Sequence, residues 1–87
     1  MTYRIDIKSS AERDLAGLPK AERQRIDQRI LRLAEDPRPT GVVKLAGHAN
    51  LYRIRVGTYR IIYAIADDTL IIVVTRVAHR KDVYRGM

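Results

Sequence analysis

The segment from Leu51 to Tyr63, LYRIRVGTYRIIY, constrains the fold most strongly because it has the pattern of a β-hairpin with one favoured register. Apolar and polar residues alternate on both sides of Gly57-Thr58, a pair that suits a type II′ or I′ two-residue turn. Such a turn sets Arg55 directly across from Arg60. Facing like charges destabilise a strand pair, whereas a favourable cross-strand pair contributes roughly 0.2–1 kcal/mol. The sequence therefore places like charge where two strands must pair.

Side chains alternate between the two faces of a strand, so Arg53 shares a face with Arg55 and Arg60. We call this side of the sheet the arginine face. A second two-residue turn at Asp67-Asp68 predicts that Thr75 lies opposite Arg60 and continues the arginine face with Thr75, Val77 and His79. The other face collects apolar residues for the core: Tyr52, Ile54, Tyr59, Ile61, Tyr63, Ile65, Ile72 and Val74. We expect a cationic cluster of Arg53, Arg55 and Arg60, with His79 and Arg80 at its edge.

The remaining patterns predict one α+β domain over residues 1–87, in the order β-α-α-β-β-β. A small antiparallel sheet would pack on an N-terminal helical hairpin. Ser9, followed by Glu12 at capping-box spacing, opens the first helix, and Gly17 with Pro19 ends it. VVKLAGHAN is expected to form a loop or a short edge segment. Strands are expected over four segments: Tyr3–Ile7, Leu51–Val56, Tyr59–Ile65 and Leu70–Val77.

The second helix, in KAERQRIDQRILRLAED, carries an apolar stripe of Ile26, Ile30 and Leu33 at i, i+4, i+7 spacing. Its other face is mostly charged, with Arg23 and Asp27 spaced as an i,i+4 ion pair. We expect the stripe to pack on the sheet and the charged face to be solvated.

The chain has a formal charge of +7, from 17 lysine and arginine residues against 10 aspartate and glutamate residues. This excess indicates an anionic partner, either nucleic acid or an acidic protein segment. Arginine outnumbers lysine, which favours bidentate phosphate contacts. No acidic residue occurs from Pro37 to Ala66. A basic surface that is only solvated is the alternative explanation of the charge.

Missing residue types and patterns narrow the function classes. The chain has no cysteine, which excludes disulfides and thiolate chemistry. No apolar run reaches the roughly 20 residues that span a bilayer, and the start, MTYRIDIKSS, has no signal-peptide pattern. We therefore expect a cytoplasmic protein that does not associate with membranes. Because carboxylates are absent from the cluster, we expect neither a metal ion nor a small-molecule cofactor.

Two explanations of the arginine cluster stay open. Arginines can simply keep an exposed sheet face soluble, and a pairing with Asp6 on the first strand would favour that explanation. An anion bound between the arginines is the interpretation we favour, because strain without a role in the fold is typical of functional sites.

The sequence resembles the RelE toxins of the RelE/ParE toxin–antitoxin superfamily. The likeness runs in order through YRIDI, the helical hairpin, KLAG, LYRIRVGTYRIIYAI and HRKDVYR. It implies a fold related to microbial ribonucleases and a metal-independent endoribonuclease. Such a toxin enters the ribosomal A site and cuts mRNA by attack of the 2′-OH on the adjacent phosphate. It also implies a cognate antitoxin that wraps the toxin and blocks this surface.

The resemblance assigns roles by position. Arg53 and Arg55 correspond to paired basic residues of the first long strand, Arg60 to the arginine before IIY, Arg80 to the arginine after the last strand, and Tyr84 to the terminal tyrosine. The hypothesis that follows has Arg60 and Arg80 holding the scissile phosphate, Arg53 and Arg55 binding flanking phosphates, and Tyr84 stacking on a base or orienting the nucleophile.

The sequence departs from several RelE members, which have lysines at the paired strand positions. Arginine, with a pKa above about 12, cannot serve as the base. His79 is the candidate base, because an imidazole pKa near 6.5 suits proton transfer at neutral pH. Lys81 is a second candidate. Lys44 and Lys81 are expected to contact RNA, while His48 is expected to be incidental.

Two rival functions remain. A ParE-like protein shares the scaffold but inhibits DNA gyrase and cuts no RNA. A non-catalytic module that binds RNA or an acidic antitoxin segment is the other rival, and it gains support because no assured proton acceptor is present.

Overall fold

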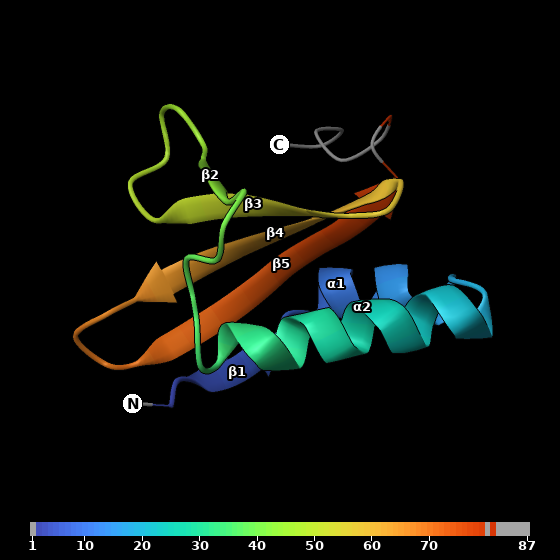
Figure 1. The fold of residues 1–87 in the computed structure, drawn as a ribbon, viewed down its shortest axis with the longest axis horizontal. Helices are drawn as coiled ribbons and strands as arrows, with labels where there is room; N and C mark the ends of the chain where they lie inside the picture. Colours follow the sequence, from blue (N-terminus) through green and yellow to red (C-terminus); the bar gives the residue numbers. More distant parts are fainter. Residues whose placement is uncertain (1, 80, 82–87) are drawn as a thin grey trace.

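Two helices cover one face of a five-stranded sheet in the computed structural model, which describes residues 2–79 and 81 (Figure 1). The helices are α1 (Ser9–Ala16) and α2 (Lys20–Leu33), and the strands are β1 (Arg4–Ile7), β2 (Val43–Lys44), β3 (Leu51–Val56), β4 (Tyr59–Ala66) and β5 (Ile71–His79). The strand order is β1-β5-β4-β3-β2. β1 runs parallel to β5, and the other neighbours are antiparallel. The predicted α+β class is confirmed, with one parallel pair.

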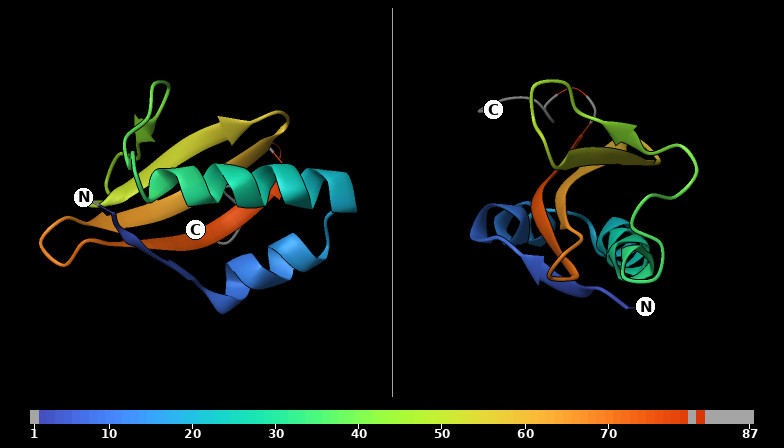
Figure 2. Two further views of the ribbon diagram at one scale, coloured as in Figure 1. Left: turned by 60° about the horizontal axis from the view of Figure 1, so that its bottom comes forward. Right: turned by 90° about the vertical axis from the view of Figure 1, so that its left-hand side faces the viewer.

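The helices and the β2–β3 loop lie on opposite sides of the sheet (Figure 2). α1 packs against β5, and α2 packs against β3. Neither helix of the described chain is long and apolar enough to cross a bilayer.

The predicted capping box at the start of α1 is wrong. Ser9 is already helical, and Lys8 occupies the N-cap position with no side-chain cap hydrogen bond. The reason is that the Lys8 N–H donates to the carbonyl of Val74, so β1 pairing carries the extended backbone to the helix start. Gly17 ends α1 as predicted, and Pro19 is the N-cap residue of α2.

The core lies between the helices and the sheet face predicted to be apolar. Ile26, Ile30 and Leu33 of α2 are buried, as predicted. All eight predicted sheet residues take part: Ile54, Ile61, Tyr63, Ile65, Ile72 and Val74 are buried, and Tyr52 and Tyr59 pack at the margin. Full burial of an Ile or Val side chain stabilises a fold by about 1.5–3 kcal/mol. The core therefore determines which side of each strand faces the helices.

The β3–β4 hairpin has the predicted register. Gly57 has φ +61°, and Leu70 is the one non-glycine residue with positive φ in the described chain, so Thr58 has a negative φ. This combination of signs is that of a type II′ turn, in which the first central residue favours glycine. Arg55 lies across from Arg60, which confirms the like-charge pairing.

The predicted β4–β5 register is wrong, because Arg60 pairs with Ala78 and not with Thr75. Two features of the chain cause the difference. Ala66 pairs with Ile71, so the connecting loop spans 67–70 and is longer than the predicted two-residue turn. A bulge then shifts the register between Ile62 and Tyr63, leaving Thr75 as the extra residue of β5.

A polar cluster holds together the end of the sheet farthest from the β3–β4 turn. The Arg38 guanidinium donates to both oxygens of Asp67, at 3.1 and 2.8 Å, and the Tyr3 hydroxyl donates to Asp67 Oδ1 at 2.8 Å. Arg38 also lies over the ring of Tyr52, 5.1 Å from its centroid. These contacts link the residue before β1, the α2–β2 connection, β3 and the β4–β5 loop. The hydrogen bonds from Arg38 and Tyr3 lower the pKa of Asp67.

We predict that this cluster makes stability fall in acid. A lowered folded-state pKa means that Asp67 stabilises the fold above its unfolded pKa of about 3.9, and that this contribution is lost as the pH falls through the folded value. Urea unfolding of Asp67→Asn between pH 3 and pH 7 should show a smaller loss of stability in acid than the unsubstituted protein shows. Asp68→Asn is the matched control, because Asp68 makes no side-chain hydrogen bond or ion pair to the described residues. Identical acid profiles for the Asp67 variant and the unsubstituted protein would contradict this assignment.

Candidate functional site

Arg53, Arg55 and Arg60 project from the sheet face that the helices leave uncovered. The register sets Arg53 opposite Ile62 and Arg55 opposite Arg60, so all three occupy adjacent positions on one face. The hydrogen bonds of Arg55 and Arg60 at the turn go to backbone carbonyls: Arg55 Nε donates to Gly57 O at 3.3 Å, and Arg60 Nη1 donates to Tyr59 O at 3.2 Å. Each of these two guanidinium groups is therefore tied to the backbone beside the turn, from positions that face each other across the strand pair.

Asp6 pairs with Arg4 and not with the cluster. Arg4 Nη2 lies 3.0 Å from Asp6 Oδ2, and the hydrogen bonds from Arg4 lower the pKa of that carboxyl. Both residues lie on the outer strand β1, with β5 and β4 between β1 and the arginines of β3. The explanation in which Asp6 neutralises the cluster therefore receives no support from the structure.

The prediction that His79 lies on the arginine face is wrong. His79 pairs with Tyr59, and the two rings meet edge to face with centroids 5.9 Å apart. The bulge at Thr75 is the cause, because one extra residue reverses the facing of every residue after it in the strand. His79 Nδ1 also accepts a hydrogen bond from the Lys81 N–H at 3.3 Å. His79 therefore lies on the side of the sheet opposite to Arg53, Arg55 and Arg60.

The residue that sequence analysis missed is Arg76. The bulge sets Arg76 opposite Ile62 and Ala78 opposite Arg60, so Arg76 and Ala78 lie on the arginine face, where Thr75 and Val77 had been predicted. Val77 turns to the helix side and joins the main core. The only sequence signal for this exchange is the apolar character of Val77, because a bulge has no fixed residue pattern of its own.

Side chains of α1 hold this part of β5. Arg76 Nε donates to Asp14 Oδ2 at 3.0 Å, and the same oxygen accepts the Val77 backbone N–H at 2.9 Å. One helical turn earlier, Ser10 Oγ donates to the Thr75 carbonyl at 2.8 Å. The β1 pairing with β5 ends at Ile7 and Val74, so Ser10 and Asp14 supply the partners that a longer strand would have supplied.

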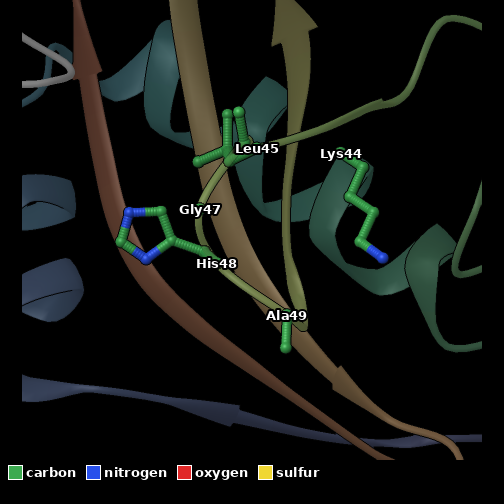
Figure 3. A pocket seen from close by; sticks show the side chains of 6 residues that line it. Lys44, Leu45, Gly47, His48 and Ala49 are labelled. Atoms are coloured by element: carbon green, nitrogen blue, oxygen red, sulfur yellow. The ribbon is translucent and has the colours of Figure 1, made fainter.

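The β2–β3 loop folds over part of the arginine face, which is therefore less open than predicted. Leu45 is 9% exposed and packs with Ile62 and Ala78 in a second, smaller cluster. Figure 3 shows Leu45 and His48 lying over the sheet, with the Lys44 side chain directed away from His48. Beside this loop a groove of about 660 Å³ is lined by Lys8, Ser10, His48, Leu51, Ala64, Val73, Thr75 and Arg76.

The predicted RNA contacts are divided between different surfaces. Lys44 lies on the edge strand β2 and pairs with Tyr52. Its side chain is therefore on the face of the sheet that the helices cover. Lys81 is exposed just after β5. Arg80 and Tyr84, the other two predicted site residues, lie outside the described residues.

The arrangement favours binding an anion over binding a cation. Within residues 2–79 and 81, no three or more His, Cys, Asp or Glu side chains come together in a way that could hold a metal ion. The arginines instead present guanidinium groups, which bind phosphate through paired N–H donors.

The chain is similar to known proteins over nearly its whole length. A family model described as the ParE toxin of type II toxin–antitoxin system, parDE, matches residues 5–84. Toxin RelG of Mycobacterium tuberculosis is 33% identical, over 98% of this chain and 99% of its own length. This chain belongs to the RelE toxin family.

Solved toxin structures agree with this membership. The RelE–RelB complex from Pyrococcus horikoshii OT3 matches with a TM-score of 0.81 and 34% identity, over 92% of this chain and 97% of that one. The toxin–antitoxin complex RelBE2 from Mycobacterium tuberculosis matches with a TM-score of 0.82 and 29% identity, over 92% of this chain and 100% of that one. The sheet and helices described above are therefore the fold of a RelE toxin of a toxin–antitoxin system.

We predict that Asp14 is a main determinant of stability at the site. Asp14→Ala leaves the Val77 N–H and the Arg76 guanidinium without this carboxylate, which should lower the free energy of unfolding by about 2 kcal/mol. Asp27→Ala is the matched control on α2, because its 3.8 Å pair with Arg23 is solvent-exposed and should contribute about 0.5 kcal/mol or less. Urea unfolding of both variants tests the difference, and equal losses would contradict it.

Proposed function

We propose that this toxin is a ribosome-dependent endoribonuclease that cuts mRNA without a metal ion, and that a cognate antitoxin neutralises it. The observation that carries the proposal is the pairing of Arg55 with Arg60 beside Arg53 on the arginine face. Like charges in register are unfavourable in the free protein and favourable around a phosphate. The RelE resemblance of the sequence supplies the reaction and the ribosomal target.

In the proposed reaction the ribose 2′-oxygen attacks the adjacent phosphorus in line with the leaving 5′-oxygen. The new O–P bond forms a 2′,3′-cyclic phosphate, and the broken P–O bond leaves a 5′-hydroxyl that takes up a proton. Negative charge builds on the nonbridging oxygens of five-coordinate phosphorus, where preorganised guanidinium groups stabilise it. Arg60 holds the scissile phosphate together with Arg80, while Arg53 and Arg55 bind flanking phosphates.

The proton of the 2′-OH passes to water in this proposal. Arginine does not accept it at neutral pH, and His79 faces the Tyr59 side with Nδ1 occupied. Catalysis then depends on charge stabilisation and on the positioning of the strand, with Tyr84 proposed to stack on a base or to orient the nucleophile. Lys44 and Lys81 are proposed to contribute to RNA affinity rather than to the chemical step.

An antitoxin partner is proposed from the solved relatives. The matching structures from Pyrococcus horikoshii and Mycobacterium tuberculosis are toxin–antitoxin complexes. The +7 charge of this chain suits a partner whose acidic segment covers the arginine face.

The match to the ParE family model favours a second candidate function, inhibition of DNA gyrase without RNA cleavage. A supercoiling assay with purified gyrase distinguishes the two. Loss of supercoiling together with intact mRNA would support the second candidate and contradict the first.

We predict that Arg60→Ala lowers mRNA cleavage by about 100-fold or more, because it removes a charge contact that forms in the transition state. The measurement is mapping of mRNA 5′ ends after purified toxin is mixed with translating ribosomes. Arg23→Ala, on α2 and paired with Asp27, is the control and should cleave like the unsubstituted protein. Cleavage that survives Arg60→Ala unchanged would exclude the proposed site.

A further inference from the structure

A guanidinium group from α2 lies against the β3–β4 turn, beside the site built by the sheet. Arg25 occupies the space next to Gly57 in which any larger residue would place its Cβ: that position would lie 3.4 Å from Arg25 Cζ and 3.8 Å from Nη1, with Nη2 closer still. Figure 2 shows the N-terminal half of α2 running past this turn. Gly57 therefore serves two purposes, since its φ of +61° forms the turn and its missing side chain admits Arg25.

Two guanidinium groups contact this one glycine from different elements. Arg25 lies against the Cα of Gly57, and Arg55 Nε donates to the Gly57 carbonyl at 3.3 Å. Arg60 lies across the strand pair from Arg55. The turn is therefore surrounded by positive charge supplied by α2, β3 and β4, which extends the cluster beyond the arginine face.

The ion pair of Arg25 leaves most of its donors available. Glu22 Oε2 lies 3.8 Å from Arg25 Nη1, beyond hydrogen-bonding distance, and the Arg25 side chain is 55% exposed. An exposed pair of this geometry contributes little and yields readily to a competing anion.

We propose that Arg25 is a phosphate-binding residue, which contacts the RNA backbone next to the flanking phosphate held by Arg55. The proposal rests on the function proposed above and adds to it a contact from α2. An RNA strand crossing the arginine face would pass around the β3–β4 turn and meet Arg25 there. Since Arg25 binds a flanking phosphate, it contributes to affinity and not to the chemical step.

The test compares two substitutions that remove the same charge from the same helix. Arg25→Gln and Arg23→Gln each remove one positive charge, and both residues are exposed and paired with an acidic neighbour at 3.8 Å. The probe is a labelled single-stranded 2′-O-methyl RNA, which lacks the attacking hydroxyl, and the readout is fluorescence anisotropy at several salt concentrations. Arg25→Gln should weaken binding about fivefold and reduce the salt slope by about 0.7, the value for one phosphate contact on a single strand. Arg23→Gln should change affinity by less than about twofold.

The outcomes separate this inference from the proposed function. Equal losses in the two variants, or no loss in either, overturn the role of Arg25 while RNA binding by the unsubstituted toxin still stands. Absence of mRNA cleavage by the unsubstituted toxin on translating ribosomes overturns the proposed function and the role of Arg25 with it. In cleavage assays on ribosomes, Arg25→Gln should raise KM and leave kcat within about twofold; a fall in kcat with unchanged KM would also overturn the assignment.

Discussion

The structure depends on an apolar core that fixes the register of the β3–β4 hairpin and thereby places Arg55 across from Arg60 at a type II′ turn. Ile54 and Ile61 form the neighbouring cross-strand pair, and their burial fixes which face of the hairpin meets the helices. A slip of one residue would turn the arginines into the core, because side chains alternate along a strand. Burial of each isoleucine is worth about 1.5–3 kcal/mol, more than the 0.2–1 kcal/mol scale of a cross-strand pair. The core therefore imposes the like-charge contact, and the contact provides a site for an anion.

The β-bulge in β5 and the hydrogen bonds of Asp14 add further residues to the arginine face. The bulge at Thr75 brings Arg76 and Ala78 beside the arginines and sends Val77 into the core. Asp14 then holds both Arg76 and the Val77 backbone from α1. This toxin thus holds the β5 side of its cationic surface from α1, and Arg25 of α2 adds a further guanidinium group at the turn.

Sequence patterns predicted the hairpin, the helices, the core residues of the sheet and the facing of Arg53, Arg55 and Arg60, because alternation and a two-residue turn determine all of these. The predicted facing of His79 on the arginine face is wrong. The predicted β4–β5 loop was two residues too short, which leaves the facing of β5 unchanged, as the burial of Ile72 and Val74 shows. The bulge adds one residue, which reverses the facing from Arg76 to His79. Bulge position depends on packing of Val77 and on the hydrogen bonds of Asp14, and neither is visible in local sequence. Arg25 was missed for a similar reason, since its contact with Gly57 joins segments far apart in the chain.

The most direct test of the account is the stability of Arg55→Thr in the free toxin and with RNA bound. If the arginine face is an anion site held against its own repulsion, Arg55→Thr should raise the free energy of unfolding at low salt by up to about 1 kcal/mol. The gain should shrink as salt screens the charges. A 2′-O-methyl RNA should then stabilise the unsubstituted toxin more than the variant. If Arg55→Thr is instead less stable at every salt concentration and RNA stabilises both proteins equally, the arginines are structural and the account is wrong.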